Sequence, residues 1–315
     1  MTKPTNDCTI SDAAEIWMRR CELEQLERAT LHSYRGHVKN HIEPKMGHLL
    51  LNELSAPDVR EFLDAMLQDS TRAMAKKCLT TLRSIISAAQ ERGLVQHNVA
   101  RDVKLRRADR HKPDRVFPTK SEIKALLANV SDRHRPLIMT ALLTGMRMSE
   151  LRGLKWSAID FERSIITVRE RADRYCEMGS TKSSTSRREI PMGPSLKSVL
   201  QGWRPACPTG ELDLVFPNGV GNVETHSNIY NRIFKPLMIE CGIVDGEGAP
   251  RFSLHAMRHA AASLFIEQGW PPKKIQTMLG HSSITMTYDV YGHLFHDPAK
   301  DVNLMGEMER GLLAA

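Results

Sequence analysis

The sequence has no long apolar run. No stretch approaches the roughly 20 consecutive apolar residues that a membrane-spanning helix requires. The polar start, Met1 to Asp7, also lacks the apolar segment of a secretory signal peptide. We therefore expect a cytoplasmic protein.

The cysteines show no metal or redox pattern. Six are present, and no two of them form a C-x-x-C pair. This spacing argues against a zinc ribbon, a redox motif and a disulfide framework. We expect free thiols, and the sequence predicts neither a bound metal nor an organic cofactor. The cysteines are Cys8, Cys21, Cys78, Cys176, Cys207 and Cys241.

The charge balance points to a polyanionic partner. The 315 residues are 41% hydrophobic and 26% charged, and the formal net charge is +7. A chain of this length can form one large domain or two ordinary ones. A basic surplus favours nucleic acid, because lysine and arginine displace counterions from phosphates.

A basic segment divides the chain. Residues 104–117, KLRRADRHKPDRVF, carry six Lys or Arg against two Asp and interrupt the apolar periodicity. The segment is either a solvated charged loop or a strap across a phosphate backbone, and we favour the strap. We therefore predict a helical DNA-binding domain over 1–103, a linker over 104–117, a catalytic domain over 118–298 and a tail over 299–315.

The first part of the chain has helical periodicity throughout. Its fourth helix is expected from Thr71 to Arg92, with Lys76 and Lys77 on the outer face. Four short helices with basic outer faces suit a DNA-clamping module, although an ordinary helical domain would have the same pattern.

The second part is predicted to be mainly α with one small antiparallel β-sheet. Thr119 and Glu122 have the spacing of a capping box at a helix start. The β-branched run 164–170 and the run 188–192 are typical of strands. The polar stretch between them is interpreted as the tip of a long hairpin.

Four separated motifs carry residues suited to chemistry on a phosphate. They are TGMRMSEL with Arg147 and Glu150, KSSTSRREIP with Lys182, HAMRH with His255 and Arg258, and LGHSSITMTYDVYGH with His281, Tyr288 and Tyr291. Glu150 falls in the first turn of a helix, where the helix dipole favours a carboxylate. His255 and Arg258, three residues apart, share a helical face.

Each motif also has a simpler interpretation. His255 and His259 are four apart and could mimic a zinc site, but Ala256 stands where a zinc protease carries Glu. Arg147 and Glu150 could be a surface ion pair, and Lys182 could lie on a solvated loop. His281 could merely follow the end of a helix.

Taken together, the motifs resemble the tyrosine site-specific recombinases of the phage-integrase family. That pattern has R-x-x-E-L, a hairpin lysine, H-x-x-R, L-G-H and a tyrosine ahead of a histidine. The resemblance implies a two-domain C-shaped clamp, with a helical core-binding domain and a catalytic domain. It also implies a DNA strand transferase that forms a 3′-phosphotyrosyl intermediate and needs neither metal nor ATP.

The resemblance implies a role for each motif residue. Arg147 and Arg258 would bind the non-bridging phosphate oxygens, where fixed cationic forks suit the developing charge. Lys182 would protonate the leaving 5′-oxygen, and His255 would handle the tyrosine proton. His281 would donate to the phosphate, and Glu150 would orient Arg147 or its turn. The expected DNA-binding residues are Arg106, Arg107, Arg110, Arg187, Arg188, Lys76 and Lys77.

The nucleophile is predicted to be Tyr291. Many family members place the tyrosine nine residues after the L-G-H histidine, where this chain has Val290. Tyr288 stands at seven and Tyr291 at ten. The text D-x-Y-G-H-L-F resembles a subgroup whose nucleophile lies in Y-G-H, so Tyr291 is chosen and Tyr288 is expected to be a packing residue.

The resemblance therefore predicts a recombinase that integrates or excises a mobile element. It would be a monomer in solution and a homotetramer on double-stranded DNA, and an accessory directionality factor is an open possibility. Two alternatives remain, a type IB topoisomerase-like enzyme and a catalytically silent DNA-binding protein of the same fold. The tail places Val302, Met305, Met308 and Leu312 on one helical face, to pack on its own domain or dock on a neighbouring subunit.

Overall fold

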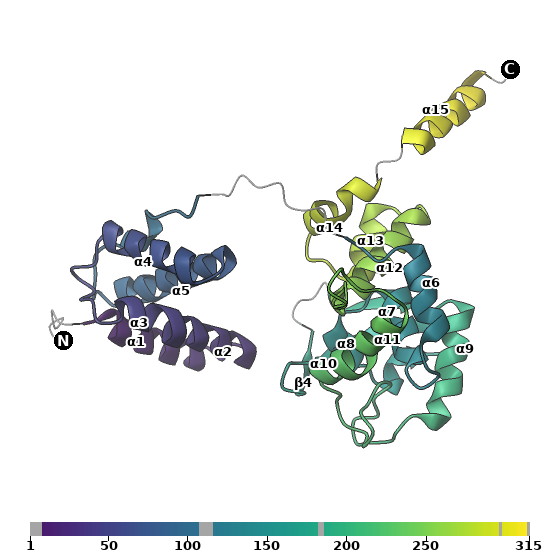
Figure 1. Ribbon diagram of the computed structural model, residues 1–315, viewed down its shortest axis with the longest axis horizontal. Coiled ribbons are helices and arrows are strands. Elements are labelled where there is room, and N and C mark those ends of the chain that lie inside the picture. The colour runs from purple at the N-terminus through teal and green to yellow at the C-terminus, as the bar shows by residue number, and fades with distance from the viewer. Residues whose placement is uncertain (1–7, 107–115, 182–185, 296–297, 314–315) are drawn as a thin grey trace. The chain divides into compact units, whose positions relative to one another are not determined.

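The structure, a computed structural model, describes residues 8–106, 116–181, 186–295 and 298–313. The chain divides into two compact units, Met1–Pro113 and Asp114–Ala315 (Figure 1). Most of the predicted linker, residues 107–115, lies outside the described residues. Each unit has its own hydrophobic core, and the two are described separately below.

The first unit is all helical in its described part. Its elements are α1 (Ile10–Leu23), α2 (Arg28–His37), a π-helical turn η1 (Val38–Ile42), α3 (Glu43–Met46), α4 (Ala56–Asp69), α5 (Arg72–Glu91) and a short 3₁₀ turn η2 (Val99–Arg101). The long helix α5 begins where Thr71 accepts a hydrogen bond from the backbone N–H of Met74. Its apolar face packs on α1 and α4, with Leu63, Leu82 and Ile86 completely or almost completely buried.

The second unit is mainly helical and carries two small antiparallel sheets. Its helices are α6 (Lys120–Asn129), α7 (Arg135–Thr144), α8 (Met148–Arg152), α9 (Pro194–Trp203), α10 (His226–Asn228), α11 (Lys235–Glu240), α12 (His255–Glu267), α13 (Pro272–Leu279), α14 (Ile284–Tyr291) and α15 (Pro298–Leu313). A π-helical turn, η6 (Ile229–Phe234), joins α10 to α11. The unit also contains the short 3₁₀ turns η3 (Trp156–Ala158), η5 (Arg204–Ala206) and η7 (Gly292–Phe295). The strands are β1 (Ile159–Asp160), β2 (Ile165–Val168), β3 (Glu170–Ala172), β4 (Met178–Ser180) and β5 (Arg188–Pro191).

The predicted capping box is confirmed. Thr119 caps α6 by accepting from the N–H of Glu122, and the Glu122 carboxylate accepts from the backbone N–H of Thr119 at 2.8 Å. Reciprocal bonds of this kind satisfy two of the N–H groups that have no partner inside the helix.

The predicted hairpin is partly confirmed. β2 pairs with β5 in an antiparallel register that sets Val168 opposite Arg188, and β1 pairs with the other edge of β2. The prediction of one sheet was wrong, because the chain after Arg169 forms β3 and β4, which pair with each other. Each of these strands has only three residues, too few for an alternation of apolar and polar residues to reveal it.

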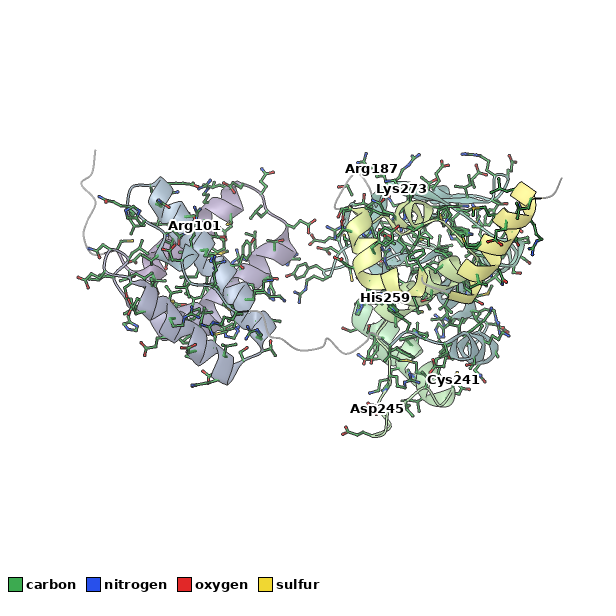
Figure 2. All side chains as sticks on the ribbon, turned by 90° about the horizontal axis from the view of Figure 1, so that it is seen from above. Arg101, Arg187, Cys241, Asp245, His259 and Lys273 are labelled. Atoms are coloured by element: carbon green, nitrogen blue, oxygen red, sulfur yellow. The ribbon has the colours of Figure 1, made fainter. Side chains whose placement is uncertain are left out.

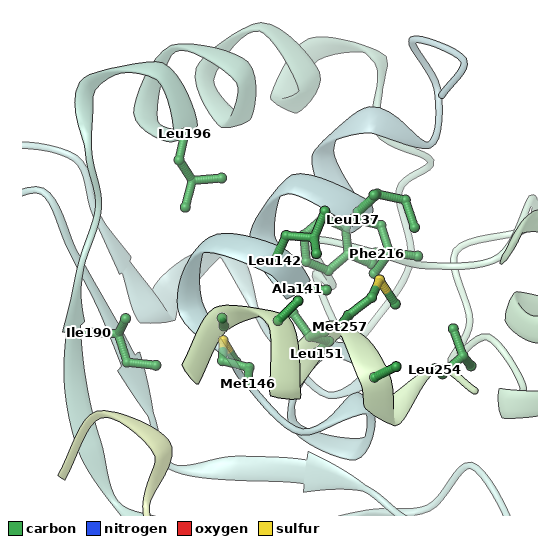
Figure 3. Close-up of a cluster of buried hydrophobic side chains, with 14 of the residues drawn as sticks. Leu137, Ala141, Leu142, Met146, Leu151, Ile190, Leu196, Phe216, Leu254 and Met257 are labelled. Atoms are coloured by element: carbon green, nitrogen blue, oxygen red, sulfur yellow. The ribbon is translucent and has the colours of Figure 1, made fainter. Parts of the chain in front are cut away.

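Helices α7 and α12 pack against each other in the hydrophobic core of the second unit (Figure 3). The core side chains labelled there include Leu142, Met146, Ile190 and Met257, all nearly inaccessible to solvent. This packing fixes the positions at which α7 ends and α12 begins, and these are the positions from which the functional side chains project.

Gly145 ends α7 in a conformation that favours glycine. Its φ is +63°, and an added Cβ would lie 2.6 Å from Leu279 Cδ2 and 3.2 Å from Ala261 Cβ. Gly242 has a similar φ of +68° but no atom within 4 Å of such a Cβ.

The two glycines make a matched pair of variants. Gly242→Ala should lower the free energy of unfolding by about 1–2 kcal/mol, the cost of left-handed backbone. Gly145→Ala should lower it by roughly a further 1–3 kcal/mol, because the methyl group overpacks the core. Denaturant unfolding of the full chain, followed through the tryptophans of the second unit, measures both. Equal losses would show that the turn at Gly145 has room for a side chain.

Candidate active site

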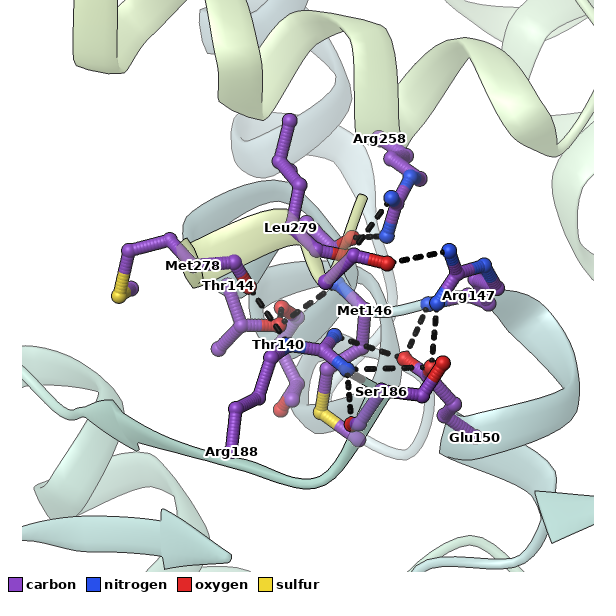
Figure 4. Close-up of polar contacts among 12 residues, drawn as sticks. Thr140, Thr144, Met146, Arg147, Glu150, Ser186, Arg188, Arg258, Met278 and Leu279 are labelled. Atoms are coloured by element: carbon purple, nitrogen blue, oxygen red, sulfur yellow. Dashed lines mark hydrogen bonds and ion pairs between the residues drawn. The ribbon is translucent and has the colours of Figure 1, made fainter. Parts of the chain in front are cut away.

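The carboxylate of Glu150 joins Arg147 to Arg188 in the polar cluster (Figure 4). Arg147 is the N-cap of α8, and its backbone N–H donates to Glu150 Oε2 at 2.9 Å. The Arg147 side chain turns back as well, and its Nη1 donates to Glu150 Oε1 at 2.8 Å. Glu150 thus holds both the backbone and the guanidinium of Arg147. The Arg147 side chain remains 33% exposed, so part of it is open to a ligand.

Arg188 completes the cluster from the sheet. Its Nη2 donates to Glu150 Oε2 at 2.8 Å and its Nη1 to Oε1 at 3.1 Å. Its Nε donates to the carbonyl oxygen of Met278 at 2.7 Å, which ties β5 to the end of α13. The side chains of Arg188 and Glu150 are each only 2% exposed.

The prediction that Arg188 binds DNA is corrected by this geometry. Its strand neighbours Arg187 and Glu189 are exposed, whereas Arg188 and Ile190 face the core. Side chains alternate between the two faces of a strand, so the buried Ile190 directs Arg188 inward. Arg188 is therefore part of the interior of the site.

Arg258 is buried on α12, and its guanidinium connects the end of α7 to the end of α13. Nη1 donates to the carbonyl oxygen of Gly145 at 2.8 Å, and Nη2 donates to that of Leu279 at 2.7 Å. Burial, followed by the charges of Arg147 and Arg188, lowers the pKa of Arg258 to about 9. The side chain therefore keeps its positive charge at neutral pH.

His281 follows Gly280, the left-handed residue that ends α13. Its ring is buried, and Nδ1 lies 2.9 Å from the hydroxyl oxygen of Thr287. Burial, followed by the charges of Arg258, Arg147 and Arg188, lowers the pKa of His281 to about 4. The imidazole is therefore neutral at physiological pH.

Tyr291 is buried beside these groups, with 1% of its surface exposed. Its ring stacks on His281 at 6.4 Å between centroids, and Phe117 lies 5.8 Å away. Its hydroxyl oxygen is 2.7 Å from Nδ1 of His259. Tyr288, by contrast, is 50% exposed, so the prediction that it is a packing residue was wrong.

Sequence reasoning missed His259 as the partner of the tyrosine. The sequence favoured His255 for this contact, but His255 is exposed at the start of α12 and lies edge-on to His259, 4.8 Å between ring centroids. The signal was present, because residues four apart share a helical face and His259 is four residues beyond His255.

The remaining predicted residues fall into two groups. Lys182, Arg107 and Arg110 lie outside the described residues. Arg106, Arg187, Lys76 and Lys77 are exposed, and Figure 2 shows Arg187 at the surface.

Within the described ranges, no three or more His, Cys, Asp or Glu side chains are grouped to hold a metal ion. Over the same ranges, no helix has the length and apolar character needed to cross a membrane.

The cluster concentrates positive charge. Arg147 and Arg188 bind the carboxylate of Glu150, and Arg258 lies near enough for the charges of both arginines to lower its pKa. His281 adds no charge. Guanidinium groups held at fixed positions suit a phosphate group, because each can donate two parallel hydrogen bonds to its oxygens. A phenol oxygen lies in the same site, so the arrangement combines an anion-binding centre with a nucleophile.

Comparisons with known proteins agree with this site. The model of the phage integrase family matches residues 117–297, and the model of the phage integrase central domain matches residues 10–106. The chain therefore belongs to the phage integrase family, whose members are tyrosine site-specific recombinases, enzymes that transfer DNA strands.

The relatives include bacterial recombinases and integrases. A tyrosine recombinase XerC-like protein of Caldanaerobacter subterraneus subsp. tengcongensis is 26% identical over 319 residues, covering 91% of this chain and 80% of the relative. An integrase of Streptomyces ambofaciens is 26% identical over 301 residues, covering 90% of this chain and 76% of the relative.

Two solved structures share the fold. The Tn1549 transposon integrase in complex with a circular intermediate DNA has a TM-score of 0.78 at 21% identity, covering 95% of this chain and 99% of that chain. A lambda integrase dimer bound to a core site has a TM-score of 0.69 at 20% identity, covering 92% of this chain and 96% of that chain. The predicted fold class, mainly α with a helical core-binding domain and a catalytic domain, is confirmed.

The lowered pKa of His281 predicts a pH dependence of stability. Between about pH 4 and the ordinary histidine value of 6.5, the unfolded chain binds a proton that the folded chain does not. The free energy of unfolding should therefore rise with pH across this window, by up to about 1.4 kcal/mol per pH unit from this group.

His281→Asn should remove that part of the slope, whereas His293→Asn, at an exposed histidine of the same unit, should keep it. Denaturant unfolding at several pH values between 4 and 7 measures both slopes. A His281→Asn slope equal to that of the wild type would show that the folded site accepts a charged imidazole.

Proposed function

We propose that this protein is a site-specific DNA recombinase that cleaves and rejoins strands through a 3′-phosphotyrosyl intermediate, integrating or excising a mobile element. One observation carries the proposal. Three arginines, a histidine and a buried tyrosine gather in one cluster, although they come from segments up to 144 residues apart in the sequence. The names of the relatives, recombinases, integrases and transposases, support the same function.

The reaction assigns a task to each group. The Tyr291 oxygen attacks the phosphorus, its O–H bond breaks, and the bond from phosphorus to the 5′-oxygen breaks. Arg147 and Arg258 stabilise the negative charge on the non-bridging oxygens, and His281 donates a hydrogen bond there. Lys182 gives a proton to the leaving 5′-oxygen. The tyrosine proton passes to a histidine of α12: the resemblance assigns this task to His255, and in the free protein the hydroxyl lies against His259. The energy of the phosphodiester bond is kept in the phosphotyrosine, so religation needs no ATP.

The free protein holds Tyr291 in a shielded position. Its hydroxyl is hydrogen-bonded to His259, and its ring lies against the rings of His281 and Phe117. A buried oxygen cannot reach a phosphate of a duplex, so this enclosure has to open when DNA binds. Phe117 also stacks on His293, and it belongs to the predicted linker, so a change in the linker on DNA binding would act directly on the enclosure.

Tyr291→Phe should abolish covalent adduct formation while leaving DNA affinity close to that of the wild type, because only the attacking oxygen is removed. Tyr288→Phe, at the exposed tyrosine of the same helix, is the matched control and should react normally. Both are assayed on a nicked duplex whose site is selected from random-sequence DNA with the full chain. Adducts from Tyr291→Phe and none from Tyr288→Phe would reverse the assignment.

The same assay separates the alternative functions. A catalytically silent DNA-binding protein would form no adduct with any selected duplex. A type IB topoisomerase-like enzyme would form adducts and relax supercoils but would not exchange strands between two duplexes. Exchange between two separate duplexes therefore identifies the recombinase.

We assign DNA binding to cationic residues of both units and of the predicted linker. Lys76 and Lys77 on α5, the linker residues Arg106, Arg107 and Arg110, and Arg187 beside the site would contact phosphates as the two units close around a duplex in a C-shaped clamp. The protein would be a monomer in solution and a homotetramer on DNA. Dimer and tetramer complexes of lambda integrase with DNA support this assembly.

Replacing Lys76 and Lys77 together with Ala should weaken binding equally on all DNA sequences. The slope of log affinity against log salt concentration should become shallower by about 0.9 for each phosphate that the variant no longer neutralises. The double replacement with Arg keeps both charges and should keep the slope. Fluorescence-anisotropy titrations at several salt concentrations give these slopes. An unchanged slope, or weaker binding to one sequence alone, would remove α5 from the DNA interface.

The tail is proposed to act between subunits. In α15 the apolar residues Val302, Met305, Met308 and Leu312 are 71, 54, 51 and 76% exposed, so they are available to a partner. Docking of this face on a neighbouring subunit would link the active sites of a tetramer.

Deleting residues 299–315 should leave half-site binding intact and impair tetramer assembly and strand exchange, as measured by native gels and recombination assays. Normal assembly and exchange by the truncated chain would exclude docking between subunits.

A further inference from the structure

Thr287 is a buried polar residue to which the chemistry above assigns no task. It lies on α14, four residues before Tyr291, and its side chain has no solvent exposure. Its hydroxyl oxygen is 2.9 Å from Nδ1 of His281. The hydroxyl is therefore directed at the histidine expected to contact the phosphate.

This orientation differs from that of other helical threonines in the same unit. The hydroxyls of Thr140, Thr144 and Thr277 each donate to the carbonyl oxygen four residues earlier, at 2.7, 2.5 and 3.0 Å. That bond is the usual one for a threonine inside a helix. For Thr287, the bond that the structure shows runs to the imidazole.

Burial and the charges around His281 keep its ring neutral, so the position of its single proton decides whether the ring can donate a hydrogen bond to a phosphate. Arg258, Arg147, Arg188 and His255 face the ring, and the three arginines disfavour a second proton on it. A neutral imidazole carries one N–H, on either Nδ1 or Nε2, and the other nitrogen is an acceptor. An acceptor turned toward a phosphate would repel it, whereas an N–H would bind it.

We propose that Thr287 is a positioning residue that donates its hydroxyl hydrogen to Nδ1 of His281 and thereby keeps the proton of the neutral ring on Nε2. Nδ1 then points into α14, and Nε2, on the other side of the ring, is left to donate to a non-bridging phosphate oxygen. The inference rests on the proposed function for the phosphate contact, whereas the tautomer is a property of the free protein.

The tautomer can be read without DNA. In the full chain labelled with ¹⁵N-histidine, the nitrogen shifts distinguish a protonated from an unprotonated ring nitrogen, and His281→Asn identifies the signals of His281. The wild type should show Nε2 protonated and Nδ1 as a hydrogen-bonded acceptor at pH 7. Thr287→Val keeps the shape but removes the hydroxyl, and should shift the Nδ1 signal or populate the other tautomer. Thr287→Ser keeps the hydroxyl and should retain the wild-type signals.

The reaction gives the second readout. On the selected nicked duplex, Thr287→Val should form the covalent adduct roughly tenfold more slowly, which is the lower end of the effect of removing a hydrogen-bond partner that orients a metal-bound imidazole. Its affinity for the same duplex should be unchanged, and Thr287→Ser should react close to the wild-type rate. A merely structural role would instead lower the fraction of folded protein and leave the tautomer of the folded fraction unaltered.

Two results would overturn the inference. One is a wild-type His281 protonated on Nδ1, which needs no variant and so stands even if Thr287→Val does not fold. The other is a folded Thr287→Val with wild-type nitrogen shifts and rate. If the wild type forms no adduct on any selected duplex, the proposed function fails, and the nitrogen shifts still decide the tautomer.

Discussion

The geometry of the site depends on the buried carboxylate of Glu150. Burial of a lone carboxylate costs several kcal/mol, so a charged Glu150 requires partners. It accepts hydrogen bonds from the backbone and side chain of Arg147 and from two nitrogens of Arg188. Burial acts to raise the pKa of Glu150, but the bonds and charges of Arg188 and Arg147 outweigh it, and the pKa lies below its ordinary value. The carboxylate therefore stays charged and joins α8 to β5.

The same cluster leaves an excess of positive charge. The cluster has three guanidinium groups and one carboxylate. Each guanidinium also donates to backbone carbonyl oxygens, Arg147 to Gly280 and Arg188 to Met278. Arg258 donates to the carbonyl oxygens of Gly145 and Leu279. Because carbonyl dipoles fix the donors without neutralising them, the site is organised for an anion before one arrives. The neutral state of His281 follows first from the burial of its ring, and this surplus reinforces it, since a further cation beside three arginines is unfavourable.

Local signals in the sequence were sufficient for much of the fold and for most of the motif residues. Thr119 and Glu122 marked the start of α6, and the β-branched run 164–170 marked β2. The long-range contacts were not predictable from spacing alone. Arg188 meets Glu150 across 38 residues, and Tyr291 meets His259 across 32, so only the folded core determines these pairs. The inward direction of Arg188 could still have been inferred, because it is two residues from the apolar Ile190 in a strand.

The helical geometry of α14 explains why the tyrosine stands ten residues after His281. Thr287 faces inward against the His281 ring, so the positions three and four residues further along share its face. These positions are nine and ten residues after the histidine, held here by half-buried Val290 and buried Tyr291. Tyr288, at seven, is turned by about 100° from Thr287, because a helix has 3.6 residues per turn, and it faces solvent. A tyrosine can therefore reach the site from position nine or ten, but from position seven it would require the helix to rotate and to withdraw Thr287 from His281.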